Sequence, residues 1–98
     1  MTKIPFSVRM QIYTNAMLQY GEKNQYIVAI EELSECQKEI CKALRGQLNE
    51  EHLAEEVADA MIMLEQVRML FGINDLVDRK MDEKITRLDR NLRGVNLE

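Results

Sequence analysis

The strongest structural signal in this chain is the segment NEEHLAEEVADAMIMLEQVRMLF at residues 49–71. Apolar side chains recur in it at alternating spacings of four and three residues, which is the period of one helix face. The members of this stripe are Leu53, Val57, Ala60, Leu64, Val67 and Phe71. Asn49 is suited to cap the helix, because its side chain can accept a hydrogen bond from a free amide of the first turn. The segment therefore predicts a helix with a packing seam.

Three further segments show the same period, and a glycine follows each of the four helical stretches. Glycine is favoured just past a helix end because it adopts left-handed backbone angles without strain. We therefore expect helices over residues 7–20, 25–45, 50–71 and 75–92. The second stripe holds Tyr26, Ile30, Leu33, Ile40 and Leu44, and the fourth holds Val77, Met81, Ile85, Leu88 and Leu92. The fold class is all-α: a four-helix bundle-like domain with an antiparallel central hairpin.

Composition limits both the size and the class of the protein. With 98 residues, 46% of them hydrophobic, the chain is expected to form a single domain over residues 1–98. Its net charge of -4 argues against a nucleic-acid partner, since such surfaces are usually basic. Cys36 and Cys41 match neither a zinc nor a redox spacing, and no apolar run is long enough for a membrane. We expect a cytoplasmic protein without a membrane partner.

The helix predicted over 50–71 is apolar well beyond its seam. Met61, Ile62, Met63, Met69 and Leu70 cover much of its remaining surface. A helix that is apolar nearly all round needs more partners than a small monomer provides. The pattern predicts a homodimer or a homotetramer; the alternative is a compact monomer in which methionines fill core gaps.

Two carboxylate pairs, Glu32 with Glu35 and Glu56 with Asp59, lie at nearly equal distances on either side of Gly46. Folding the chain back at this glycine brings all four acids to one level. Each pair of like charges on a helix costs about 0.2 to 0.5 kcal/mol, so such a cluster needs a cation. Ligation by oxygen alone favours Mg²⁺. The alternative is an acidic face that is merely solvated.

A family resemblance can be stated on these residues. The segments EELSE at 31–35 and EEVAD at 55–59 resemble the E-E-x-x-E and E-x-x-D signature of the MazG-like all-α nucleoside triphosphate pyrophosphohydrolases. The resemblance extends over about residues 26–92 and is nearest to the short single-domain members of phage and Bacillus type. It implies a helical homo-oligomer that hydrolyses a nucleoside triphosphate to the monophosphate and pyrophosphate, in the manner of a nucleotide-pool house-cleaning enzyme.

The resemblance also implies roles for individual acids. Glu32, Glu35, Glu56 and Asp59 become ligands of Mg²⁺, for which Mn²⁺ can substitute. Glu31 and Glu35 become the candidate catalytic acids that orient or deprotonate the attacking water. Which of the two acts on the water is left open, as are the number of metal ions and the preferred base and sugar.

The last predicted helix carries candidate phosphate-binding residues. The family often has Asn-x-Lys-x-x-Arg there, and the aligned segment is DEKITR at residues 82–87. Lys84 and Arg87 match the two basic positions and are expected to contact substrate phosphates. Asp82 replaces the usual asparagine, which puts a contact between this position and the substrate in doubt. A solvated basic face is the alternative for both basic residues.

Two other functions fit the same residues. One is a non-enzymatic, oligomeric helical adaptor whose acidic groove binds a basic partner. The other is a related pyrophosphohydrolase that acts on phosphoribosyl-ATP, because a metal scaffold of this kind contacts phosphates more than bases. Release of pyrophosphate from a panel of triphosphates distinguishes an enzyme from an adaptor.

Overall fold

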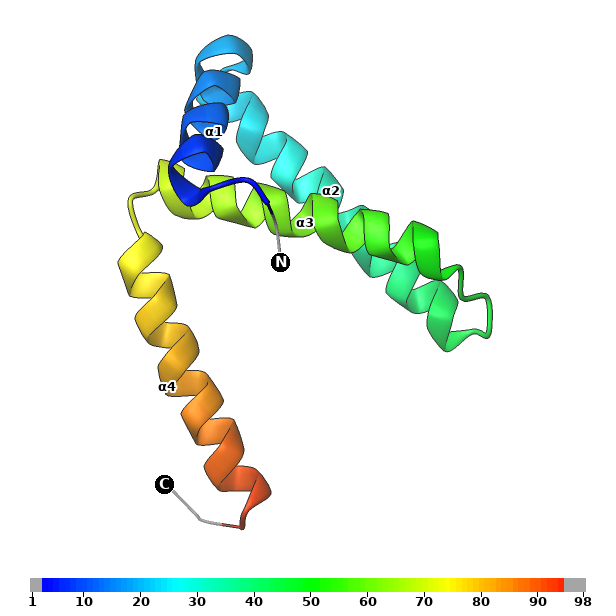
Figure 1. Ribbon diagram of the computed structural model, residues 1–98. Coiled ribbons are helices and arrows are strands. Elements are labelled where there is room, and N and C mark those ends of the chain that lie inside the picture. The colour runs from blue at the N-terminus through cyan, green and yellow to red at the C-terminus, as the bar shows by residue number, and fades with distance from the viewer. Residues whose placement is uncertain (1–2, 95–98) are drawn as a thin grey trace.

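The computed structural model describes residues 3–94 and contains four α-helices (Figure 1). They are α1 (Phe6–Tyr20), α2 (Glu22–Leu44), α3 (Glu50–Leu70) and α4 (Asn74–Leu92). Residues 3–94 contain no strand, so the all-α prediction with four helices is confirmed. The predicted domain also takes in residues 1–2 and 95–98, which lie outside the described part of the chain.

The helix ends follow the local chemistry of the turns. Asn49 caps α3 as expected: its Oδ1 accepts a hydrogen bond from the backbone amide of His52 at 3.0 Å. Gly46, just after α2, has a φ of 76°, a value that favours glycine. Helix α2 begins three residues earlier than predicted, because Gly21 alone separates it from α1. Asn24 therefore lies inside the helix and donates to the Tyr20 carbonyl at 2.7 Å.

Helices α2 and α3 lie side by side and run in opposite directions (Figure 1). At one end, Gln25 Nε2 donates to Gln66 Oε1 at 2.7 Å, and both side chains are buried. At the other end, near the turn, His52 Nδ1 lies 3.3 Å from Glu39 Oε1. These two contacts set the register, in which residues equally far from the turn face each other.

The face that packs between α2 and α3 coincides with the predicted apolar stripes at Ala60 only, among the buried residues of the described chain. Buried positions are Gln25, Ala29 and Glu39 on α2, and Ala60, Met63 and Gln66 on α3. In contrast, Ile30 and Leu44 of the predicted α2 stripe are 65% and 84% exposed. Small side chains at Ala29 and Ala60 allow the helices to approach closely, and polar residues beside them pair across the contact. The half-buried acids Glu32 and Glu56 thus lie nearer the contact than the apolar side chains Ile30 and Leu44.

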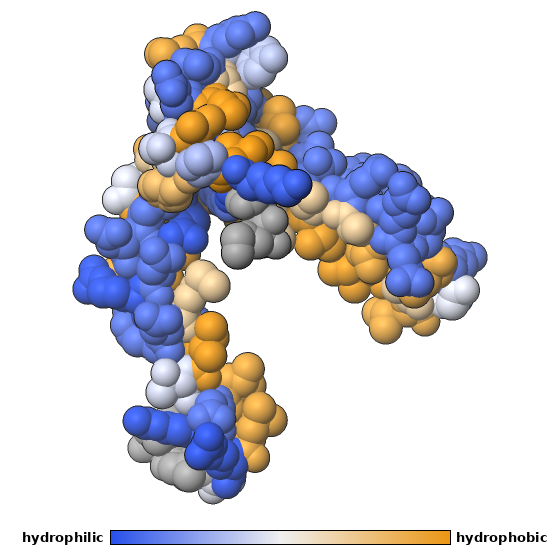
Figure 2. Space-filling model, viewed as in Figure 1, coloured by the Kyte–Doolittle hydropathy of each residue, from blue (hydrophilic) through white to orange (hydrophobic). Residues whose placement is uncertain are grey.

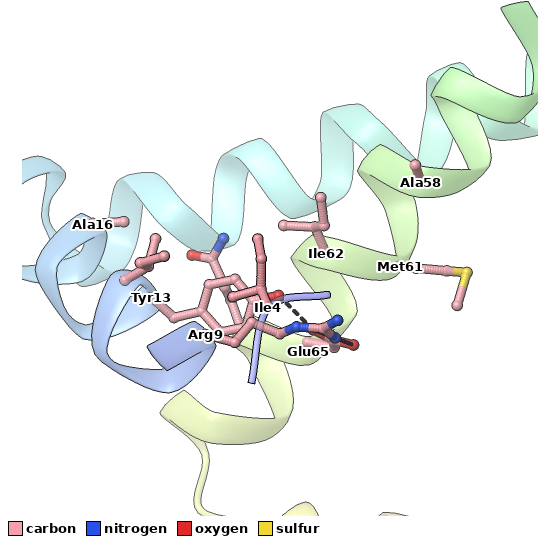
Figure 3. Close-up of a pocket in the computed structure, with 10 residues that line it drawn as sticks. Ile4, Arg9, Tyr13, Ala16, Ala58, Met61, Ile62 and Glu65 are labelled. Atoms are coloured by element: carbon pink, nitrogen blue, oxygen red, sulfur yellow. Dashed lines mark hydrogen bonds and ion pairs between the residues drawn. The ribbon is translucent and has the colours of Figure 1, made fainter. Parts of the chain in front are cut away.

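Helix α1 packs beside the end of α3 through a polar cluster next to an apolar cavity (Figure 3). Arg9 Nη1 lies 2.9 and 2.7 Å from the two carboxylate oxygens of Glu65, and the Tyr13 hydroxyl donates to the same carboxylate. Tyr13 is buried. The cavity has a volume of about 500 Å³, and its walls include Ile12, Ala58 and Ile62.

Helix α4 departs from the other three helices (Figure 1). Arg68 holds its start: Nη2 lies 2.6 Å from Asp78 Oδ1, and Nε donates to Asn74 Oδ1 at 3.1 Å. Beyond that corner no residue of α4 is buried within the described chain. Figure 2 shows apolar surface along the side of α4 that faces the α2–α3 arm, and again on the arm's side that faces α4. Within residues 3–94 no helix is long and apolar enough to cross a membrane.

Candidate metal centre

Three of the predicted acids meet between α2 and α3. Glu32 of α2 and Glu56 and Asp59 of α3 each contribute a carboxylate oxygen, and these oxygens lie within 4.8 Å of one another. Glu32 and Glu56 are half-buried and Asp59 is exposed. The antiparallel packing of α2 and α3 brings them together, because Glu32 and Asp59 are equally far from the turn. Asp59 is thus the most accessible of the three acids.

Glu56 carries the least satisfied polar atom of this cluster. Its Oε2 is buried, and no hydrogen-bond partner for it exists in the described part of the chain. A buried carboxylate oxygen without a donor costs free energy, since such an oxygen is normally paired with a donor or bound to a metal. The oxygen is part of a carboxylate of the three-acid cluster, and a hard divalent cation bound by that carboxylate would offset the cost of its burial.

Glu32 shows the electrostatic consequence of the arrangement. Partial burial raises the pKa of the Glu32 carboxyl above its usual value, and the charges of Asp59 and Glu56 raise it further. A hydrogen bond with Asp59 and the charge of Glu35 act in the same direction. The site therefore favours a bound proton or another positive charge. Within residues 3–94 the cluster consists of carboxylates without a histidine or cysteine, and this all-oxygen donor set fits Mg²⁺.

The other two predicted acids lie at the edge of this cluster. Glu35 is exposed, and within residues 3–94 it is not part of the group whose oxygens converge. Its charge nevertheless acts on Glu32. Glu31 precedes Glu32 on α2 and is also exposed. The structure thus brings together three of the four predicted ligands and leaves Glu31 and Glu35 accessible to water beside them.

The predicted phosphate-binding residues lie on α4, apart from the acids. Lys84 and Arg87 are exposed and line a hollow with Lys80 and Glu83. Within residues 3–94 neither Lys84 nor Arg87 makes a side-chain hydrogen bond or an ion pair. Because α4 points away from the α2–α3 arm (Figure 1), a single chain does not bring these two basic residues to the acidic cluster.

Two polar contacts on either side of the acids escaped the sequence analysis. Toward α1, the buried Gln25 and Gln66 side chains pair. Toward the turn, the buried Glu39 carboxylate lies 3.1 Å from Lys42 Nζ and 3.3 Å from His52. The hydrogen bond from Lys42 is the main reason why the pKa of Glu39 is lowered. Gln25 and Gln66 are equally far from the turn between α2 and α3, and so are Glu39 and His52. This equal spacing is the sequence signal that identifies both pairs.

Comparisons with protein-family models, with curated proteins and with solved structures give no match for this chain. The fold and the geometry define an all-helical protein that has a half-buried cluster of three carboxylates between α2 and α3.

Proposed function

We propose that the protein is a Mg²⁺-dependent nucleoside triphosphate pyrophosphohydrolase of the MazG-like all-α type. The observation that carries the proposal is the buried, unpartnered Glu56 oxygen within a cluster of three acids. The raised pKa of Glu32 supports it, because the cluster as it stands lacks positive charge. Glu32, Glu56 and Asp59 are also members of the E-E-x-x-E and E-x-x-D pattern by which the chain resembles this family.

In this proposal Glu32, Glu56 and Asp59 hold the metal from both helices, with Glu35 joining from the edge. A bound Mg²⁺ supplies charge that neutralises phosphate oxygens and lowers the pKa of water. Mn²⁺, which also prefers oxygen ligands, substitutes for it. The open side at Asp59 admits the triphosphate.

The reaction itself is the attack of water on the α-phosphorus of the nucleotide. The new bond joins the water oxygen to this phosphorus, and the bond from the phosphorus to the bridging oxygen of the β-phosphate breaks. Pyrophosphate leaves with the bridging oxygen. Glu31 and Glu35, exposed beside the cluster, are the two candidates to accept the proton of the water. A carboxylate in this role acts as a base and forms no covalent bond with the substrate.

The test is the release of pyrophosphate from a panel of canonical and modified nucleoside triphosphates and phosphoribosyl-ATP, with Mg²⁺ and with Mn²⁺. We expect release from at least one of these compounds, and a loss of about 100-fold or more in Glu56→Gln, which keeps the shape of the side chain but not its charge. Glu51→Gln is the matched control, because Glu51 is an exposed acid of α3 outside the cluster. Equal rates in Glu56→Gln and the parent contradict the proposal.

A further inference from the structure

A hollow without charged side chains lies between the end of α1 and the start of α2. Its volume is about 690 Å³. Its walls combine an aromatic ring with amide side chains: Tyr20, Gln19, Asn24, Gln25 and Gln66. Among the described residues that line it none is charged, although charged residues make up 31% of the chain. Uncharged amides and an aromatic ring suit a neutral, planar ligand that forms hydrogen bonds. We call this site the amide hollow.

Two of these amides have a carbonyl oxygen that is free to accept. Asn24 Nδ2 donates to the Tyr20 carbonyl at 2.7 Å, which orients the Asn24 side chain. Gln25 Nε2 donates to Gln66 Oε1, also at 2.7 Å. Within residues 3–94 neither Asn24 Oδ1 nor Gln25 Oε1 has a hydrogen-bond partner. A ligand in the amide hollow therefore meets acceptor oxygens, for which it needs N–H or O–H donors.

The α2 wall of the amide hollow continues toward the acids that are proposed to act on the attacking water. Asn24, Val28, Glu31 and Glu35 follow one another at spacings of four, three and four residues, so they share one side of the helix. The first two line the hollow, and Glu31 and Glu35 are exposed. A ligand in the hollow therefore lies on the same side of α2 as these acids.

The α3 wall has the same relation to the acidic cluster. Gln66 follows Asp59 by seven residues, nearly two turns, so both side chains lie on one side of α3. At 1.5 Å per residue, about 10 Å separates Gln66 from Asp59 along α3, and about 6 Å separates Val28 from Glu32 along α2. A ribose links the base of a nucleotide to its α-phosphate and spans a gap of this size.

We infer that the amide hollow binds the base of the nucleotide whose phosphates the acidic cluster holds, and that it prefers bases with an exocyclic amino group. The inference rests on the proposed function and extends it to the base. The amino group of adenine or cytosine donates to the free oxygens of Asn24 and Gln25, whereas hypoxanthine and uracil carry an acceptor oxygen at that position. Tyr20 is 57% exposed, and its ring is available to stack on the base.

The first measurement compares bases that differ in one group. The full chain with Mg²⁺ is titrated calorimetrically with non-hydrolysable α,β-methylene analogues of two pairs, ATP with inosine triphosphate and CTP with UTP. We expect the amino member of each pair to bind about 2- to 10-fold more tightly. Asn24→Ala should reduce this ratio at least about twofold. Loss of the Asn24 bond to the Tyr20 carbonyl affects all analogues alike, so it leaves the ratio unchanged.

Asn15→Ala is the matched control for this comparison, because Asn15 is an exposed amide of α1 outside the amide hollow. It should keep the parent's ratio. Equal affinities of the parent within both pairs overturn the inference, and so does an Asn24→Ala variant that keeps the parent's ratio.

The second measurement asks whether the base is bound at all. The α,β-methylene analogue of ribose 5-triphosphate keeps the sugar and the phosphates and lacks only the base. We expect the parent to bind it at least about fivefold more weakly than the ATP analogue. Tyr20→Ala should weaken the ATP analogue by about fivefold or more and leave the base-free analogue unchanged, whereas Tyr20→Phe keeps the ring and the parent's affinity. Equal affinities of the parent for the two analogues overturn the inference.

These measurements separate failure of the inference from failure of the proposed function. If pyrophosphate is released but neither the base nor its amino group changes the affinity, the activity stands and the role of the amide hollow is overturned. If no triphosphate binds in the presence of Mg²⁺ and none releases pyrophosphate, the proposed function fails, and the inference that rests on it fails with it.

Discussion

Glu32 of α2 and Asp59 of α3 face each other across the contact between the two longest helices, with carboxylate oxygens no more than 4.8 Å apart. Partial burial, together with the charges of Asp59 and Glu56, raises the pKa of Glu32. Three carboxylates that repel one another when ionised thus lie in the contact between α2 and α3. This is the expected property of a site that is completed by a cation.

The first prediction concerns stability without divalent cations. The folded-state pKa of Glu32 lies above its usual value of 4.5, so the ionised carboxyl destabilises the fold as pH rises through that raised pKa. At neutral pH, Glu32→Gln is therefore expected to melt at a higher temperature than the parent. The gap closes as pH falls toward 4.5. Thermal unfolding followed by circular dichroism over a pH series measures both effects.

With Mg²⁺ present, the parent should instead melt at a higher temperature than Glu32→Gln. Mg²⁺ stabilises the parent by binding to its folded state, and it has fewer ligands in the variant. Glu31→Gln is the control for the cation-free comparison, since Glu31 is exposed and outside the converging group. A Glu32→Gln variant that is less stable than the parent in cation-free buffer at neutral pH would show that no repulsion resides at this position.

The second prediction concerns the buried amide pair. Gln66→Ala leaves the buried Gln25 side chain without its 2.7 Å partner, and an unpaired buried amide costs about 1 to 3 kcal/mol. We expect the free energy of unfolding in urea to fall by that amount. Gln19→Ala, at an exposed position of α1, should stay within about 0.5 kcal/mol of the parent. Similar losses in the two variants would contradict a structural role for the pair.

The third prediction concerns the contact between α1 and α3. Tyr13→Phe removes the hydroxyl that donates to the Glu65 carboxylate, and a hydrogen bond to a charged group contributes about 1.5 to 3 kcal/mol. Burial, the main cause, and the bond to Glu65 raise the pKa of Tyr13 to about 12. The contribution is therefore complete below pH 10, the ordinary value, and is lost as pH rises through about 12.

Denaturant unfolding at several alkaline pH values checks this third prediction. Tyr20→Phe is the matched control, because Tyr20 is exposed and accepts or donates no side-chain bond to Glu65 within the described residues. The parent and Tyr13→Phe should converge in stability toward pH 12. A constant difference across this range would mean that the hydroxyl is not the group responsible.

The number and extent of the helices were predictable from sequence, because the apolar period and the glycines act locally. Gly46 also placed Glu32 and Asp59 at one level, since residues equally far from a turn face each other. Sequence did not reveal which face packs. Gln25, Glu39 and Gln66 are typical of a solvated surface, yet all three are buried beside the small Ala29 and Ala60. Nor did any local pattern predict the direction of α4, which depends on Arg68 at the corner.

The apolar stripes predicted on α2, α3 and α4 were expected to pack within one chain, yet Ala60 of α3 is their only buried member among the described residues. Ile30, Ile85 and Leu88 are exposed, so the residues that look most like a core are those that the single chain leaves uncovered. Periodicity shows that a face needs a partner, and it does not show whether that partner belongs to the same chain. The contact between α2 and α3 therefore holds polar side chains such as Gln25 and Gln66, although the apolar period alone predicted apolar ones there.

The central claim, a divalent-cation site at Glu32, Glu56 and Asp59, is tested most directly by calorimetric titration of the cation-free protein with Mg²⁺ and Mn²⁺. We predict saturable binding by the parent and by Glu51→Gln, and an affinity at least about tenfold weaker in Glu56→Gln, which loses a ligand charge. Equal affinities in the parent and Glu56→Gln, or no binding by the parent with a non-hydrolysable triphosphate present, would contradict it.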